Sequence, residues 1–365
     1  MGFSLNAFEP VIRFLPEIPR PARKVELRER FFWTGLVLAI YLVMAQIPLF
    51  GISVVAPGIF EQYEFLRVIF ASRRGTLMEL GIGPIVTAGL IMQILVGSRI
   101  LQVDLSNPRE RALFTGVQKL LAIIMTVLEA SAFIFGGQYG LLDLGVALLV
   151  LAQLIVSGII VLLLDELVQK GWGLGSGVSL FILAGVAQRI VWLSFSPVGP
   201  LPDGKSLGAV IAFGQALLAG DNILSVFVRT PYPDMTGFIA MIGVFLFVVY
   251  LEGMRIEVPV AYAKYGGFRA KVPLKFLYVS NIPIILASAL FANIMLLGTF
   301  LWNNFNRNNS NFLLNLIAKY NVTAPGATPR PLPGSLVYYL SPPRGPVSVM
   351  ADPVHCHHAD RSPRR

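Results

Sequence analysis

Residues 74–97 read RGTLMELGIGPIVTAGLIMQILVG, and this stretch decides the fold class of the chain. Glu79 is its only charge after Arg74. A helix needs roughly 20 apolar residues to cross a bilayer core about 30 Å thick, so this stretch is long enough to span a membrane. It also contains the helix-breaking run Gly81-Ile82-Gly83-Pro84 near its start.

Similar apolar segments recur along the 365 residues, of which 55% are hydrophobic and 13% charged. An average soluble domain has roughly 25% charged residues, so a water-soluble fold could not bury this much apolar surface. We therefore predict an all-α, polytopic membrane protein with seven spans. They lie at about residues 31–50, 76–98, 113–135, 142–164, 173–193, 235–254 and 276–300.

The distribution of the net charge of +9 orients these spans. Loops that carry an excess of Lys and Arg stay in the cytosol, and a cytosolic N-terminus places sixteen of the 29 basic residues on that side. They are Arg13, Arg20, Arg23, Lys24, Arg28, Arg30, Arg99, Arg109, Arg111, Lys119, Lys170, Arg255, Lys264, Arg269, Lys271 and Lys275. This alternation accounts for the positive net charge without DNA as a partner, although a basic cytosolic loop could contact a ribosome.

The predicted order is a cytosolic segment (1–30), five spans (31–193), an external loop (194–234), two further spans (235–300), an external loop (301–355) and a polar tail (356–365). Within the first half, residues 57–72 follow the helix-starting Pro57. Apolar side chains recur there at helical spacing, namely Ile59, Phe60, Tyr63, Leu66 and Phe70. The simple interpretation is a short amphipathic helix on the outer side, and the alternative is a re-entrant gate.

Catalytic groups are scarce in the spans. The three histidines, His355, His357 and His358, lie in the C-terminal tail, so no span supplies a serine–histidine pair or a histidine-bound metal. The run Leu174-Gly175-Ser176-Gly177 lacks the first glycine of a membrane-protease serine loop, and no GxxxxGK[ST] phosphate loop occurs. We predict no enzymatic activity, no cofactor and no functional metal site.

Charged residues inside spans would favour an ion- or proton-coupled transporter of small solutes, which is the alternative function. Such residues are few. Glu79 lies within about one turn of the outer end of its span and could extend to the surface. Glu129 and Asp143 flank the short outer loop between the third and fourth spans, and Asp165 and Glu166 lie at a cytosolic end.

Two spans contain matched helix breaks, Gly81–Pro84 in the second and Ser280-Asn281-Ile282-Pro283 in the seventh. In a chain built from two five-span halves, such breaks indicate the transport path. Aliphatic residues lie beside them and in the fifth span: Ile82, Val86, Val178, Ile182 and Ile285. A ring of these side chains would exclude water and ions, although ordinary packing is the simpler explanation of the spacing.

Uncharged polar residues also occur inside the spans, namely Thr87, Gln93, Gln153 and Asn293. Such groups usually form hydrogen bonds between helices, worth about 0.6 kcal/mol each. The alternative is that some of them line a seam that can part.

Four segments together resemble the SecY family, which includes the alpha subunit of the archaeal and eukaryotic Sec translocon. They are residues 74–97, NPRERALFTGVQKLL (107–121), LLLDELVQKGWGLGSGVSLFI (162–182) and YVSNIPIILASALFAN (278–293). The similarity runs from LPEIPRPARKVELRER (15–30) to SPPRGPVSVMADPVH (341–355). It implies a protein-conducting channel of two five-span halves, which passes unfolded polypeptides across the membrane and releases membrane segments sideways.

The resemblance also implies roles for single residues. Ile82, Val86, Val178, Ile182 and Ile285 would form the pore ring, and Ile59, Phe60, Tyr63, Leu66 and Phe70 the plug. Thr87 and Asn293 would lie in a lateral gate between the second and seventh spans. Arg255, Lys264, Arg269 and Lys271 would form a ribosome-docking loop.

The implied partners are SecE-like (gamma) and SecG-like (beta) subunits, the ribosome, signal sequences with their nascent polypeptides, and the lipid bilayer. The implied membrane is the archaeal plasma membrane, with the endoplasmic reticulum as second choice. Family members continue after the DPVH motif into an eighth span, whereas Cys356 begins a polar tail that matches nothing. The resemblance therefore implies a C-terminally truncated chain that lacks spans 8–10.

Overall fold

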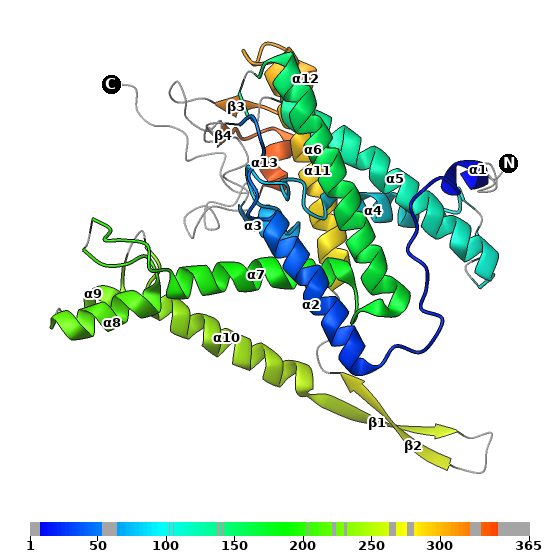
Figure 1. The fold of residues 1–365 in the computed structure, drawn as a ribbon, viewed down its shortest axis with the longest axis horizontal. Coiled ribbons are helices and arrows are strands. Elements are labelled where there is room, and N and C mark those ends of the chain that lie inside the picture. Colours follow the sequence, from blue (N-terminus) through cyan, green and yellow to red (C-terminus); the bar gives the residue numbers. More distant parts are fainter. Residues whose placement is uncertain are drawn as a thin grey trace. The chain divides into compact units, whose positions relative to one another are not determined.

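The computed structural model describes residues 8–52, 64–101, 103–104, 106–136, 139–140, 142–202, 204–220, 224–229, 232–262, 268–275, 281–321 and 330–341. These residues form helices and two short antiparallel hairpins (Figure 1). Five of the described helices are long and apolar enough to cross a membrane. They are Pro108–Phe135 (α5), Leu144–Trp172 (α6 with a π-helical turn), Gly177–Phe195 (α7), Met235–Gly253 (α10) and Ile285–Phe305 within α11. The prediction of an all-α, polytopic membrane protein is confirmed.

The first two predicted spans correspond to shorter helices, Leu27–Met44 (α2) and Gly83–Gly97 (α4). α4 begins at Gly83 and not at residue 76, because Gly81 has a left-handed backbone (φ +56°) and Pro84 occupies the first turn. Proline fits the first turn of a helix, where its missing N–H has no helical partner. The helix break read from the sequence is thus the actual start of α4.

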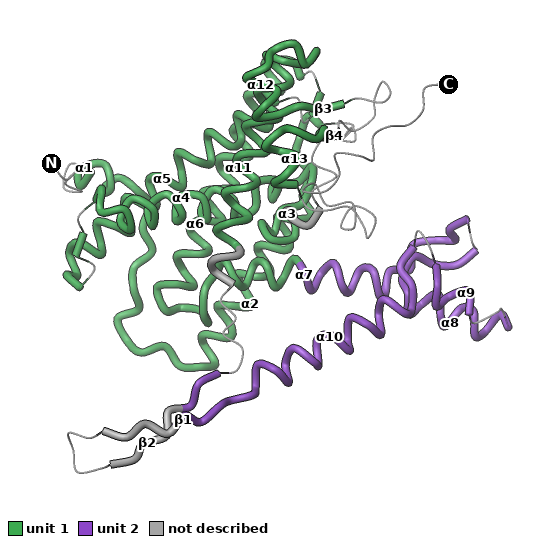
Figure 2. The backbone as a smooth tube through the Cα atoms, turned by 180° about the vertical axis from the view of Figure 1, so that it is seen from behind, with its two compact units in different colours: residues 1–185, 284–365 green, residues 186–283 purple. Residues whose placement is uncertain are grey.

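The chain divides into two compact units, residues 1–185 with 284–365 and residues 186–283 (Figure 2). In the first unit α4 packs on α5, and α5 packs on α6. Its remaining described elements are Glu9–Ile12 (α1), Glu64–Ile69 (α3), Asn281–Phe305 (α11, mostly in this unit), Phe312–Ile317 (α12), Tyr320–Asn321 (β3), Arg330–Pro331 (β4) and Leu336–Leu340 (α13). Its largest core cluster combines residues of α2, α4, α5, α6, α7 and α11.

The second unit contains the end of α7, Ala209–Ala219 (α8), Leu224–Phe227 (α9), α10 and the hairpin of Arg255–Tyr262 (β1) and Phe268–Lys275 (β2). The hairpin runs antiparallel from the pair Arg255 and Lys275 to the pair Tyr262 and Phe268. It was not expected in an all-α fold. The sequence carries a signal for it, because Gly266-Gly267 lies between two segments in which apolar residues occur at every second position.

Candidate functional site

The five predicted ring residues belong to one apolar cluster. Ile82, at the start of α4, has no exposed surface, and Val86 lies one turn further on and is also buried. The half-buried Val178, Ile182 and Ile285 pack against the same cluster from α7 and α11. The structure therefore brings together aliphatic side chains from three helices that are far apart in the sequence.

Aromatic stacking fixes the rotation of α7 at this cluster. The ring of Phe181, between Val178 and Ile182, stacks on Tyr41 of α2 with 5.0 Å between centroids and an interplanar angle of 23°. The Tyr41 hydroxyl in turn donates a hydrogen bond to the Ala71 carbonyl at 2.8 Å. Both side chains are buried, so α2, α7 and the segment before α4 are held together around the ring residues.

A polar seam joins α4 to α11. The Asn293 Nδ2 atom donates to Thr87 Oγ1 at 2.8 Å and to the Ala289 carbonyl at 2.9 Å. The Thr87 hydroxyl lies 2.9 Å from its acceptor on Gly83 and 3.2 Å from Glu129 Oε1 on α5. The two residues predicted to face each other across the lateral gate are thus in direct contact.

The structure corrects the sequence-based placement of Glu129. It does not flank the outer loop, because it lies more than one turn before the end of α5 at Phe135 and its side chain turns toward α4. Only 8% of the residue is exposed. The sequence did contain a signal for a buried Glu129, because an ionisable residue within an apolar run by default indicates a functional position.

Glu79 does not extend to the surface either, since 1% of it is exposed. Its carboxylate accepts a hydrogen bond from the Gly75 amide and forms an ion pair with Arg67 at 3.4 Å. The cause is the non-helical turn before α4, in which the Ile82 amide donates to the Phe70 carbonyl at 2.9 Å. Glu79 thereby connects α3 to the start of α4. A small cavity beside it is lined by Arg67, Phe70, Glu79, Thr87, Glu129 and Asn293, among others.

Only part of the predicted plug can be placed. Ile59, Phe60 and Tyr63 lie outside the described residues, as does the side chain of Leu66. α3 falls within the predicted range 57–72, and Phe70 packs against the apolar cluster and against a second cluster that contains Met295 and Trp302.

The predicted ribosome-docking loop coincides with the β1–β2 hairpin. Arg255 pairs with Lys275 at the base of the hairpin, while Pro259 pairs with Lys271 and Ala261 with Arg269. Lys264 lies outside the described residues.

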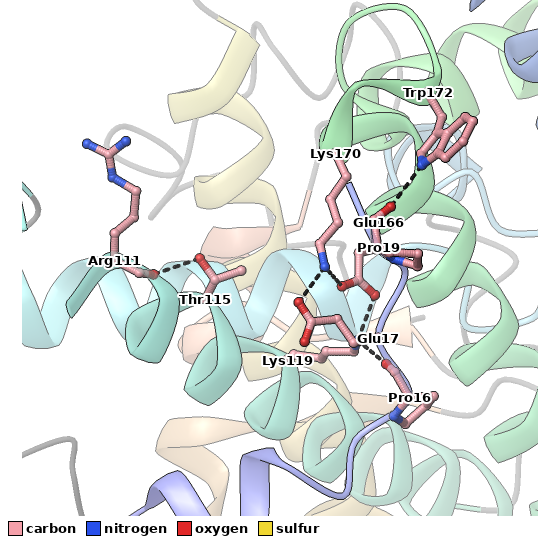
Figure 3. A network of polar contacts seen from close by, with 9 residues as sticks. All are labelled: Pro16, Glu17, Pro19, Arg111, Thr115, Lys119, Glu166, Lys170 and Trp172. Atoms are coloured by element: carbon pink, nitrogen blue, oxygen red, sulfur yellow. Dashed lines mark hydrogen bonds and ion pairs between the residues drawn. The ribbon is translucent and has the colours of Figure 1, made fainter. Parts of the chain in front are cut away.

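The N-terminal strap, residues 13–26 between α1 and α2, is bound by an ion-pair cluster from α5, the last turn of α6 and the π-helical turn after it (Figure 3). Lys170 lies 2.5 Å from Glu17 and 2.9 Å from Glu166, and Lys119 lies 2.6 Å from Glu166.

Backbone carbonyls of the strap are bound as well. Lys119 donates to the carbonyl of Pro16, and the Trp172 indole donates to that of Pro19 at 2.9 Å. The sequence marked these lysines only as basic flanks.

The remaining polar predictions differ in outcome. Gln153 exchanges hydrogen bonds with the amide and carbonyl of Phe50 at 3.0 and 3.2 Å, which ties α6 to the loop after α2. Gln93 is exposed. Within the described part of the chain, no group of three His, Cys, Asp or Glu residues could hold a metal ion. The histidine-rich tail lies outside that part.

Residues 76–340 match the sequence model of the SecY family, and residues 40–75 match that of the plug domain of Sec61p. This chain belongs to the SecY family. The plug match ends at Gly75, where the Glu79 carboxylate is bound, and the SecY match begins at the next residue. The resemblance read from the sequence is confirmed, and the chain is a multi-pass membrane protein of this family.

Three solved structures show how far the similarity extends. A protein-conducting channel is 45% identical with a TM-score of 0.65, over 80% of this chain and 63% of its own length. Sec61 in a canine ribosome–channel complex from the endoplasmic reticulum is 45% identical with a TM-score of 0.64, over 80% of this chain and 64% of its own. An idle yeast Ssh1 complex bound to the yeast 80S ribosome is 26% identical with a TM-score of 0.71, over 94% and 73%. The chain spans less than two thirds of the length of the first two.

Proposed function

We propose that this SecY-family chain forms the larger part of a protein-conducting channel subunit, and that the apolar cluster of Ile82, Val86, Val178, Ile182 and Ile285 is its pore ring. The observation that carries the proposal is the convergence of these residues from α4, α7 and α11 in one cluster. A constriction lined by aliphatic side chains excludes water and thereby blocks ions when no peptide is threaded. As parts of this proposal we retain the N-terminal half at residues 31–193 and a partial C-terminal half at 235–300.

Ion conductance of the idle, complete channel tests the ring. Replacing Val86 and Val178 with serine introduces hydroxyl groups that wet the constriction, so we expect a steady ion leak in planar bilayers. The matched control is Val156→Ser on α6, where 57% of the valine is exposed. A double ring variant as tight as the wild type would contradict the assignment.

The lateral gate is proposed to run along the α4–α11 seam. The direct hydrogen bond between Asn293 and Thr87 supports it. Such a bond between uncharged groups is worth only about 0.6 kcal/mol, so it joins the two helices and still lets them separate. Cysteines at positions 87 and 293 should crosslink to a signal sequence during insertion, whereas a cysteine at the exposed position 93 should not. Equal crosslinking at all three positions would count against a specific gate.

The transporter alternative receives less support. Glu79 and Glu129 were its candidate ion carriers, and both carboxylates are engaged, the first with Gly75 and Arg67 and the second with Thr87. Membership in the SecY family favours a conduit over coupled solute uptake and over an enzyme. Loss of uptake of a small solute on neutralising either glutamate would reverse this preference.

The proposed partners are SecE-like and SecG-like subunits and a ribosome that docks on the β1–β2 hairpin, with Arg255, Lys264, Arg269 and Lys271 as contacts. Support comes from related channels that were solved in complexes with canine and yeast ribosomes. The proposed membrane is the archaeal plasma membrane, with the endoplasmic reticulum as the alternative. Arg269→Glu with Lys271→Glu should reduce cosedimentation with ribosomes, and Lys205→Glu should not.

A further inference from the structure

Asp165 is a buried carboxylate that belongs to neither the apolar cluster nor the polar seam. It lies in the last turn of α6, and 4% of it is exposed. Its Oδ1 atom accepts a hydrogen bond from the backbone amide of Val178 at 3.1 Å, and its Oδ2 atom accepts one from Gln169 Nε2 at 2.7 Å. The side chain thus connects the end of one helix to the start of the next.

The amide of Val178 is one of the groups that a helix cannot satisfy by itself, because it lies in the first turn of α7. A carboxylate at that end also interacts favourably with the positive end of the helix dipole. Most N-terminal caps come from the residue that precedes the helix. Here the acceptor comes from α6, so the bond fixes where α7 stands on its neighbour as well as where it begins.

Gly177 makes this approach possible. A Cβ atom at position 177 would lie 2.5 Å from Asp165 Oδ1 and 2.7 Å from the Asp165 Cα atom. The preceding turn is held from the other side, because the Leu174 amide donates to Thr34 Oγ1 on α2 at 3.0 Å. The start of α7 is therefore confined between α6 and α2.

This confinement acts on the proposed pore ring. Val178 carries the bonded amide and Ile182 follows one turn later. Each residue of an α-helix advances the rotation by about 100°, so a start displaced by one residue would turn both side chains away from the cluster. We propose that Asp165 is a positioning residue of the channel, which sets the rotation and height of α7 so that Val178 and Ile182 close the ring. This inference rests on the proposed function.

The test measures the ion leak of the idle, complete channel complex for Asp165→Ala, Asp165→Asn and Asp143→Ala. Removal of the acceptor should give a leak comparable with that of Val178→Ser, whereas asparagine keeps an oxygen at the same place and should restore tightness. Asp143 is the matched control, since it caps the opposite end of α6 by accepting a hydrogen bond from the Gly145 amide of that same helix at 3.2 Å. A tight Asp165→Ala channel, a leaky Asp165→Asn channel or an equally leaky Asp143→Ala channel would each overturn the inference.

Val178→Ser in the same series distinguishes a failure of the pore-ring proposal from a failure of the role proposed for Asp165. If it leaks and Asp165→Ala does not, the ring stands and the role of Asp165 is refuted; if it does not leak, the ring itself is refuted. Should Asp165→Ala fail to assemble, Gly177→Ala displaces the same turn with the carboxylate intact. We expect that channel to leak, and a tight one would overturn the inference.

Discussion

The absence of a side chain at Gly81 allows the turn that separates the plug region from α4. The Phe70 carbonyl, which accepts from the Ile82 amide, lies where a Cβ atom of residue 81 would be, at a distance of 2.1 Å. The backbone there is also left-handed, a conformation that costs other residues roughly 1–2 kcal/mol. A single position thus fixes how the segment from α3 enters the apolar cluster.

Gly81→Ala should therefore destabilise the protein by about 2–4 kcal/mol, from left-handed strain and from the collision with Phe70. Thermal unfolding in detergent, followed by circular dichroism, measures the change. Gly97→Ala in α4 is the matched control, because a Cβ atom there meets nothing within 4 Å. Equal melting temperatures for the two variants would show that the turn tolerates a side chain.

At the scale of elements, the N-terminal strap is held by groups from α5 and from the turn after α6. The hydrogen bond from Lys170 lowers the pKa of the Glu17 carboxyl below its ordinary value. A carboxyl with a lowered pKa stabilises the bound strap at neutral pH, and this contribution disappears as the pH falls through the lowered value. Because the Glu17 side chain is 73% exposed, the ion pair contributes at most about 1 kcal/mol.

Lys170→Met should accordingly lower the equilibrium constant between the bound and the released strap by a factor of about two to five at pH 7. A dye attached to a cysteine at position 20, in a chain with Cys356→Ser, would report it through reduced quenching by Trp172, whose indole binds the neighbouring Pro19 carbonyl. Acidification below about pH 4 should produce the same change in the parent chain and little further change in the Lys170→Met chain. The control is Lys205→Met, which removes a lysine that donates to Ser225, outside the strap. A pH response that persists in the Lys170→Met chain would exclude Glu17 as its source.

At the scale of the whole molecule, α7 belongs to both compact units, since the boundary falls after Gly185. The part of α7 before the boundary carries Val178 and Ile182, and the part after it leads to α8 and α10. The basic segments at the N-terminus and in the β1–β2 hairpin predict that both lie on the cytosolic side of the bilayer.

Cysteine labelling tests this orientation. With Cys356→Ser as background, Ser225→Cys in α9 should react with a membrane-impermeant maleimide from the outer side, and Lys275→Cys in β2 only from the cytosolic side. The reason is that the opposite arrangement would translocate the basic hairpin and the basic N-terminus. Reaction of both cysteines from one side of sealed vesicles would contradict the seven-span alternation.

The sequence by itself determined the class of protein, the approximate spans, the break before α4, the family and the set of aliphatic ring candidates. These features are local, because hydropathy over some 20 residues and a Gly-Pro break express their consequences within one segment. Even the hairpin had a local signal in Gly266-Gly267, which the prediction of helices alone left unused.

Only the tertiary structure decided which side chains meet. Asn293 and Thr87 are 206 positions apart, and Lys170 and Glu17 are 153 apart. The burial of Glu79 and Glu129 and the bond from Asp165 to α7 likewise depend on the rotation of packed helices. That rotation is set by the sum of many contacts between segments, and no single segment contains the information.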